Sequence, residues 1–112
     1  MGNPIVHFEI GCKDKNKTSE FYSKLFDWKL TDIGIASSID TGGISGQIVA
    51  LGHEPNNYTM FYVEVDDVQK YLDHAVHAGG KKLVGPITIP TGTFAWFSDP
   101  EGNMVGLWKS KS

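Results

Sequence analysis

Residues 6–22, VHFEIGCKDKNKTSEFY, and residues 58–72, YTMFYVEVDDVQKYL, decide how this chain folds. Each stretch opens with strand-like alternation, reaches an aspartate and continues with a helical pattern that carries an aromatic residue. Asp14 in the first stretch and Asp67 in the second lie 53 positions apart. A repeat of this size in 112 residues indicates two similar modules that must bury their faces together.

Outward from these stretches, each half continues in the order strand, helix and three further strands. Alternation and turn residues predict the following strands: 6–12, 28–30, 35–39, 47–51, 58–65, 82–84, 94–97 and 104–108. The two helices are expected to end near Phe26 and Ala78, and each begins after an aspartate cap. Gly79-Gly80 ends the second helix, Asp99-Pro100-Glu101-Gly102 forms a tight turn, and residues 52–57 form a linker.

The sequence therefore predicts a single domain over residues 1–112, with module one at about 4–52 and module two at about 57–109. The predicted class is α+β, because two βαβββ modules form a curved mixed sheet around a cleft with the helices outside. The two modules are expected to superpose at an offset near 53.

Composition excludes several classes of protein. The net charge of −3 argues against nucleic-acid binding, and no apolar run approaches the ~20 residues of a membrane span. The first residues lack the pattern of a signal peptide, and the single cysteine, Cys12, excludes an intrachain disulfide. We therefore expect a cytoplasmic protein.

His7 and Glu9 share one face of the first strand, while Phe8 and Ile10 share the other. If the polar face lines the cleft, this pair is a general base with its orienting carboxylate, or a pair of polar anchors for a ligand. The alternative is a surface or rim pair. At the offset of 53 residues, Met60 takes the place of His7, and Tyr62 and Glu64 share its strand face. Tyr62 is a third catalytic candidate, or a packing group with a polar tip.

Aromatic side chains gather on the later strands of module two. Phe94 and Trp96 are expected to face the cleft, as are Met104 and Trp108, with Gly106 leaving room between them. This arrangement favours a pocket for a flat or apolar ligand. Ordinary sheet packing or a dimer contact is the alternative.

The remaining cysteine and histidines are expected to play structural or solvated roles. Cys12 lies on the opposite strand face from His7, so we interpret it as a core thiol. His74 and His77 are spaced for a metal but belong to a solvated helix face, and His53 lies in the linker.

The chain resembles the vicinal oxygen chelate superfamily, which includes glyoxalase I, extradiol dioxygenases, fosfomycin-resistance enzymes and bleomycin-binding proteins. The resemblance covers almost the whole chain and rests on the following markers: His7 with Asp14 and Phe21-Tyr22, residues 65–68 (VDDV), residues 78–80 (AGG) and residues 97–103 (FSDPEGN). The beginning, residues 6–10, and the end, residues 106–109, resemble the small glyoxalase-like members. Such members commonly form homodimers, so a homodimer is expected here.

The resemblance also implies where a metal would bind. Metalloenzymes of this family hold a divalent ion with a histidine on the first strand of each module and usually a glutamate on the last. His7 matches, but the corresponding positions in module two are Met60 and Gly106. In module one the last-strand position falls within residues 47–51, where only Gln47 is polar. No metal and no other cofactor is therefore predicted.

The preferred function is a glyoxalase/bleomycin-resistance-like protein that binds a small organic ligand in an aromatic cleft without the complete family metal site. The ligand-binding residues predicted are His7, Glu9, Met60, Tyr62, Phe94, Trp96, Met104 and Trp108. One alternative is a divalent-metal-dependent lyase or dioxygenase that uses His7. Another is a dimeric interaction domain whose cleft is filled by side chains. The sequence leaves open whether the protein is an enzyme.

Overall fold

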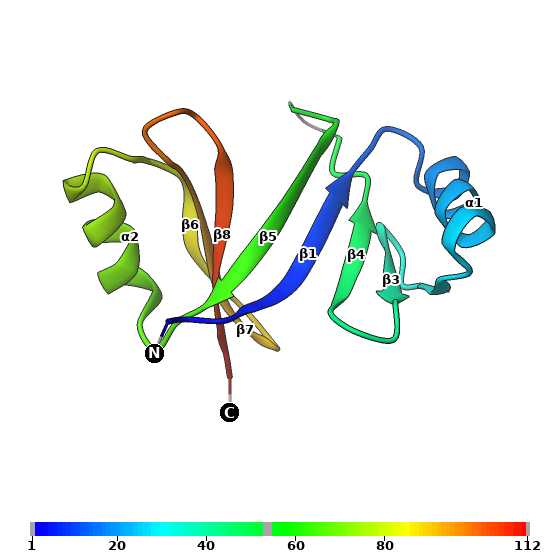
Figure 1. Cartoon of the computed structure of the whole chain (residues 1–112), viewed down its shortest axis with the longest axis horizontal. Helices are drawn as coiled ribbons and strands as arrows, with labels where there is room; N and C mark the ends of the chain where they lie inside the picture. Colours follow the sequence, from blue (N-terminus) through cyan, green and yellow to red (C-terminus); the bar gives the residue numbers. More distant parts are fainter. Residues whose placement is uncertain (1, 53–54, 112) are drawn as a thin grey trace. The chain divides into compact units, whose positions relative to one another are not determined.

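The structure is a computed structural model that describes residues 2–52 and 55–111. These residues contain eight strands and two helices, in the order βαβββ twice (Figure 1). The elements are β1 (Ile5–Gly11), α1 (Lys15–Phe26), β2 (Lys29–Asp32), β3 (Ala36–Asp40), β4 (Ser45–Val49), β5 (Tyr58–Glu64), α2 (Val68–His77), β6 (Lys81–Ile89), β7 (Gly92–Ser98) and β8 (Met104–Ser110). The predicted α+β class and the two βαβββ modules are confirmed.

The repeat is visible in the element bounds. β1 and β5 begin and end 53 residues apart, as do the first residues of α1 and α2. Asp14 caps α1 by accepting from the Lys17 backbone N–H at 3.0 Å, and Asp67 caps α2 in the same way at 3.1 Å. An aspartate at this position satisfies a backbone donor that the helix itself leaves unpaired. The predicted offset therefore holds through the first strand and helix of each module.

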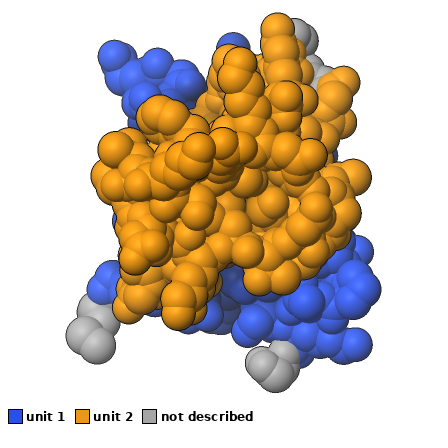
Figure 2. All heavy atoms as spheres, turned by 90° about the vertical axis from the view of Figure 1, so that its right-hand side faces the viewer, with its two compact units in different colours: residues 1–6, 61–112 blue, residues 7–60 orange. Residues whose placement is uncertain are grey.

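The chain divides into two compact units, coloured separately in Figure 2: residues 7–60 form unit 2, and residues 1–6 with 61–112 form unit 1. In unit 2 the strands pair in the order β2-β3-β4-β1, and β1 runs parallel to β4. The buried side chains of its core are Ile10, Cys12, Ile39 and Ile48. Cys12 is thus a core thiol, as predicted.

In unit 1 the strands pair in the order β5-β8-β7-β6, and β5 runs parallel to β8. The core here includes two residues of α2, and its buried members are Val65, Val68, Leu72, Ala95 and Leu107. The two parallel pairs, β1 with β4 and β5 with β8, repeat the same arrangement within each unit.

The predicted turn after β7 is confirmed. Asp99 Oδ1 accepts from the backbone N–H groups of Glu101 and Asn103, both at 2.9 Å, and Gly102 has a φ of 91°. Only glycine adopts such an angle without strain. The predicted linker includes His53, which lies outside the described residues. Within 2–52 and 55–111, neither helix has the length and apolar character that crossing a membrane requires.

Candidate functional site

Glu9 carries a buried carboxylate in unit 2. Only 3% of this residue is exposed. Its Oε1 accepts from the Gln47 side-chain amide at 3.0 Å, and its Oε2 accepts from the Tyr58 hydroxyl. Glu9 and Gln47 are direct partners in the parallel β1–β4 register, so the sheet itself sets the first of these contacts. Glu9, Gln47, Tyr58 and the neighbouring His7 are called the Glu9 cluster below.

The alternation of β1 places this cluster. Phe8 and Ile10 pack on the helix side of unit 2, where the Phe8 ring lies 5.8 Å from the Trp28 ring. Because successive side chains on a strand alternate, His7 and Glu9 share the opposite face. The sequence predicted this division of the strand.

His7 is half-buried two residues before Glu9. Burial lowers the pKa of His7 below its ordinary value of 6.5, and this effect outweighs the Glu9 charge, which acts to raise the pKa. The imidazole is therefore neutral at pH 7. A neutral imidazole offers one hydrogen-bond donor and one acceptor.

Two members of the Glu9 cluster were absent from the predicted site. Gln47 is the only polar residue of its predicted strand. Its contact with Glu9 depends on the parallel pairing of two strands far apart in the sequence, and the alternation of residues within each strand does not reveal that pairing. Tyr58 begins β5, and its ring lies over Gly11 so closely that a Cβ at Gly11 would approach it to 2.0 Å. A glycine at the end of a strand was the available signal, because it leaves room for a ring.

Unit 1 contains a second buried polar contact. The Trp96 indole N–H donates to the Tyr62 hydroxyl at 2.8 Å, and both side chains are buried. Tyr62 pairs with Gly106 across β5 and β8, and a Cβ at Gly106 would lie 2.3 Å from the Tyr62 ring. The ring therefore occupies the space that a side chain at position 106 would need.

The other predicted ligand-binding residues lie in these same elements. Phe94 and Trp108 are half-buried direct partners across β7 and β8, and Met104 is half-buried at the start of β8. Met60 is buried in unit 2. His74 and His77 are exposed on α2, as predicted. A ligand-binding role for any of these residues stays a prediction.

The side chains at the family's metal positions do not fit that metal. The structural register identifies Gln47 as the module-one counterpart of Gly106, because Glu9 pairs with Gln47 as Tyr62 pairs with Gly106. The four positions thus carry an imidazole, an amide, the thioether of Met60 and no side chain at all. Mid-series divalent ions prefer imidazole and carboxylate ligands. Within the described part of the chain, no three His, Cys, Asp or Glu side chains come together in a way that could hold an ion.

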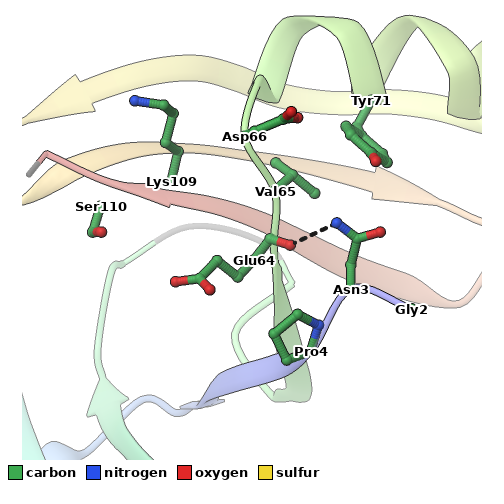
Figure 3. Close-up of a pocket in the computed structure, with 9 residues that line it drawn as sticks. All are labelled: Gly2, Asn3, Pro4, Glu64, Val65, Asp66, Tyr71, Lys109 and Ser110. Carbon is green, nitrogen blue, oxygen red and sulfur yellow. Dashed lines mark hydrogen bonds between the residues drawn. The ribbon is translucent and has the colours of Figure 1, made fainter.

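Unit 1 also has a surface hollow of about 470 Å³ that the sequence did not predict (Figure 3). Charged side chains of both signs line it, from Glu64, Asp66 and Lys109, together with Tyr71 of α2. Asn3 helps to shape the hollow by donating from its side chain to the Glu64 carbonyl at 3.1 Å. No residue of the Glu9 cluster and none of the predicted ligand-binding residues belongs to its lining.

Comparison with known proteins supports the resemblance noted in the sequence. A sequence model described as the Glyoxalase/Bleomycin resistance protein/Dioxygenase superfamily matches residues 4–107. A glyoxylase-like domain-containing protein of Didymella fabae is 31% identical over 115 residues, and the match covers 88% of each chain.

Solved structures share the fold at low sequence identity. A hypothetical protein of Bacillus halodurans C-125 is 12% identical with a TM-score of 0.76, and the match covers 100% of this chain and 97% of that one. Methylmalonyl-CoA epimerase of Mycobacterium tuberculosis is also 12% identical, with a TM-score of 0.72, and the match covers 96% and 88% of the two chains. At such identities the likeness concerns the fold alone.

Proposed function

Because this chain belongs to the Glyoxalase/Bleomycin resistance protein/Dioxygenase superfamily, we propose that it binds a small organic molecule at the Glu9 cluster, without the divalent metal of the family's metalloenzymes. The observation that carries this proposal is the burial of the Glu9 carboxylate between the Gln47 amide and the Tyr58 hydroxyl.

A buried carboxylate is costly to maintain. Removing it from water costs several kcal/mol, and hydrogen bonds offset only part of that cost. An apolar side chain at position 9 avoids the cost altogether. Buried ionisable groups beside perturbed neighbours are typical of functional sites, and His7 is such a neighbour.

The cluster favours one class of ligand. Glu9 contributes a negative charge, and its carboxylate accepts hydrogen bonds but donates none. The preferred ligand is therefore a neutral or cationic molecule with hydroxyl, amide or amine donors. A carboxylate ligand such as the methylmalonyl group, which the M. tuberculosis relative is named for, meets the like charge of Glu9 here.

Tyr62, Phe94, Trp96 and Trp108, on the strands of unit 1, remain predicted ligand contacts of that unit. The single cysteine is buried, which supports a cytoplasmic protein as the further expectation.

The test is a thermal-shift screen of small polar and aromatic compounds, run with and without divalent ions. A compound at about 100 times its dissociation constant stabilises the native state by about 2.7 kcal/mol, which corresponds to a shift on the order of 10 °C for a chain of this size. We expect neutral or cationic compounds with hydrogen-bond donors to raise the unfolding temperature. A chelator should leave this rise unchanged. Glu9→Gln should reduce the shift, whereas Glu64→Gln, an exposed carboxylate on β5, should not.

Metal analysis separates this proposal from the rival metal-dependent lyase or dioxygenase. Dialysed protein is expected to contain no stoichiometric zinc, nickel or manganese, and His7→Ala is expected to leave metal content unchanged while weakening ligand binding. Stoichiometric metal that is lost in His7→Ala would establish the rival instead. Compounds that bind Glu9→Gln as well as the parent protein would show that the site lies elsewhere.

A further inference from the structure

A second, smaller hollow of unit 1 adjoins the one already described. It has a volume of about 230 Å³, and the two hollows share Lys109 and Ser110 in their linings. The larger one is also lined by two carboxylates, Glu64 and Asp66. The smaller one is lined instead by Lys111 and two threonines, and no aspartate or glutamate of the described residues belongs to it. The charge of the lining therefore changes from mixed to positive across Lys109.

Strand pairing sets the positive end. Lys109 pairs with Thr93 across β8 and β7, and Thr93 pairs with Thr88 across β7 and β6, so the three side chains share one sheet face. Lys111 follows on the same face by alternation. Its backbone N–H donates to the Thr91 carbonyl at 3.0 Å, which continues the pairing beyond the end of β8. Two ammonium groups and two hydroxyls therefore belong to one face of the smaller hollow.

The two hydroxyls keep a donor for a ligand. Thr88 Oγ1 and Thr93 Oγ1 lie 3.2 Å apart, so one hydroxyl donates to the other. The hydroxyl that accepts retains its own hydrogen for a group outside the pair. Together with the ammonium groups of Lys109 and Lys111, this arrangement suits an anion, because hydrogen bonds from charged donors to anionic oxygens are the strong ones.

Asp66 supplies the opposite charge on the same side of the sheet. Lys109 lies two residues after Leu107, which packs in the core together with α2, so Lys109 belongs to the α2 face. Asp66 directly precedes Asp67, the cap of α2, and Figure 3 shows it on the same side of β8 as Lys109 and Tyr71. A negative and a positive group thus face the hollow from one side.

These two charges do not neutralise each other. Within residues 2–52 and 55–111, neither the Asp66 carboxylate nor the Lys109 ammonium takes part in an ion pair or a side-chain hydrogen bond. The other carboxylate of the larger hollow, Glu64, is the direct partner of Trp108 and so belongs to the opposite sheet face. Opposite charges that share a hollow without pairing fit a ligand that carries both charges.

We propose that the two hollows form one binding site for a small aminoalkyl phosphate, with its ammonium group at Asp66 and its phosphate at Lys109, Lys111 and the Thr88–Thr93 pair. A phosphate monoester carries a charge of about −1.5 to −2 at pH 7 and three terminal oxygens. It therefore uses more of the donors than a carboxylate or a phosphodiester, each of which has two such oxygens. The larger hollow, at about 470 Å³, also has the size of a ligand site.

This site is separate from the Glu9 cluster. No residue of that cluster lines either hollow, and both hollows belong to unit 1 whereas the cluster belongs to unit 2. The inference therefore does not rest on the proposed function. Because Asp66, Lys109 and Lys111 are exposed, each charge contributes modestly, and the dissociation constant is expected on the order of 1 mM.

The test is a proton–nitrogen NMR titration of the full chain with O-phosphoethanolamine, compared with its two halves, ethanolamine and inorganic phosphate. The compound that joins both charges should bind at least about tenfold more tightly than either half, because its second contact is intramolecular. The backbone signals of Asp66, Thr93 and Lys109 should move together. Added salt should weaken the binding, since exposed charges are screened.

Two substitutions separate the ends of the site. Lys109→Gln should weaken O-phosphoethanolamine binding by about fivefold or more without weakening ethanolamine binding. Asp66→Asn should weaken O-phosphoethanolamine and ethanolamine but not phosphate. The control is Lys29→Gln, an exposed lysine on β2 of unit 2, which should change none of the three affinities. Glu9→Gln should likewise leave them unchanged, so the two sites are tested independently.

Two outcomes would overturn this proposal. The first is O-phosphoethanolamine that binds no more tightly than phosphate alone, because the carboxylate end would then contribute nothing. The second is an affinity for O-phosphoethanolamine that Lys109→Gln leaves unchanged, because Lys109 is the residue that both hollows share.

Discussion

Module one carries polar side chains at four matched positions where module two carries one tyrosine, two aliphatic side chains and a glycine. Glu9 and Gln47 correspond to Tyr62 and Gly106 on the parallel strand pairs. Lys15 and Ser19 correspond to Val68 and Leu72 on the helices. The two modules share their element order, so the difference lies in side chains and not in the backbone plan.

The difference suggests a division of roles, in which module two mainly stabilises the fold and module one carries the proposed site. Module two packs its helix onto its sheet with aliphatic side chains and fills the space above Gly106 with a ring. Module one buries a carboxylate, an arrangement that contributes little to stability and that we propose serves recognition of a ligand. Four predictions test this division, and they are ordered by expected effect.

The largest effect is expected at the matched helix positions. Leu72→Ala removes a fully buried side chain from the core of unit 1 and should lower the free energy of unfolding by about 3 kcal/mol. Ser19→Ala removes one hydroxyl contact and should cost about 1 kcal/mol or less. Urea denaturation of both variants measures the difference. Equal costs would show that the two helices are held to their sheets by the same forces.

The second prediction concerns the space above Gly106. A Cβ there meets the Tyr62 ring at 2.3 Å, so Gly106→Ala should cost about 2 kcal/mol through overpacking. Adding Tyr62→Ala opens the space, and the double variant should cost less than the sum of the two single variants. Gly43→Ala is the control, because its Cβ meets only Thr41 at 3.8 Å. If the costs at positions 62 and 106 add up, the Tyr62 ring does not occupy the space that a side chain at position 106 would need.

The fold could be predicted from the sequence because its determinants are local. The alternation of β1, the Asp14 and Asp67 caps and the Gly102 turn are all set by neighbours in the chain, and the structure confirms each. Strand β6 is longer than predicted, because its pairing with β7 continues through irregular register beyond Val84.

The site could be predicted only in part. The face shared by His7 and Glu9 followed from a period of two residues. The contact of Glu9 with Gln47 depends on the β1–β4 register, and its contact with Tyr58 joins residues 49 positions apart. Neither contact produces a pattern among neighbouring residues of the sequence. The exposure of Phe21 and Leu25 was also hidden, since their helical spacing is the same whether a helix faces its own core or a partner.

The third prediction compares the two buried polar contacts. Tyr62→Phe leaves the Trp96 N–H without its acceptor and should cost about 1 kcal/mol. Glu9→Gln disturbs two donors and should cost about the same. Only Glu9→Gln should also weaken binding of the compounds found by thermal shift, through loss of a charged anchor. If Tyr62→Phe weakens binding as strongly, the Glu9 cluster is not the only part of the protein that recognises these compounds.

The smallest effect is a pH dependence of stability that comes from His7. Its counterpart in module two is Met60, which does not titrate, so the effect belongs to module one alone. Burial lowers the pKa of folded His7 below 6.5, while the unfolded chain keeps the ordinary value. Between these two pKa values the unfolded chain binds a proton that the folded chain does not. The free energy of unfolding is therefore highest above pH 6.5 and falls as the pH drops toward the folded pKa.

The measurement is urea denaturation at a series of pH values from about 7.5 to 5, in the parent protein and in His7→Gln. Asp32 and Asp99 also have lowered pKa values, from an ordinary 3.8, and so titrate below this window. His7→Gln should flatten the decline that begins near pH 6.5, and His77→Gln, at an exposed position on α2, should leave the His7 contribution in place. Stability that rises on acidification would instead mean that the Glu9 charge outweighs burial and that His7 is held protonated beside it. The Glu9 cluster would then be a neutral ion pair near pH 6, and its preference for cationic ligands would disappear with the charge.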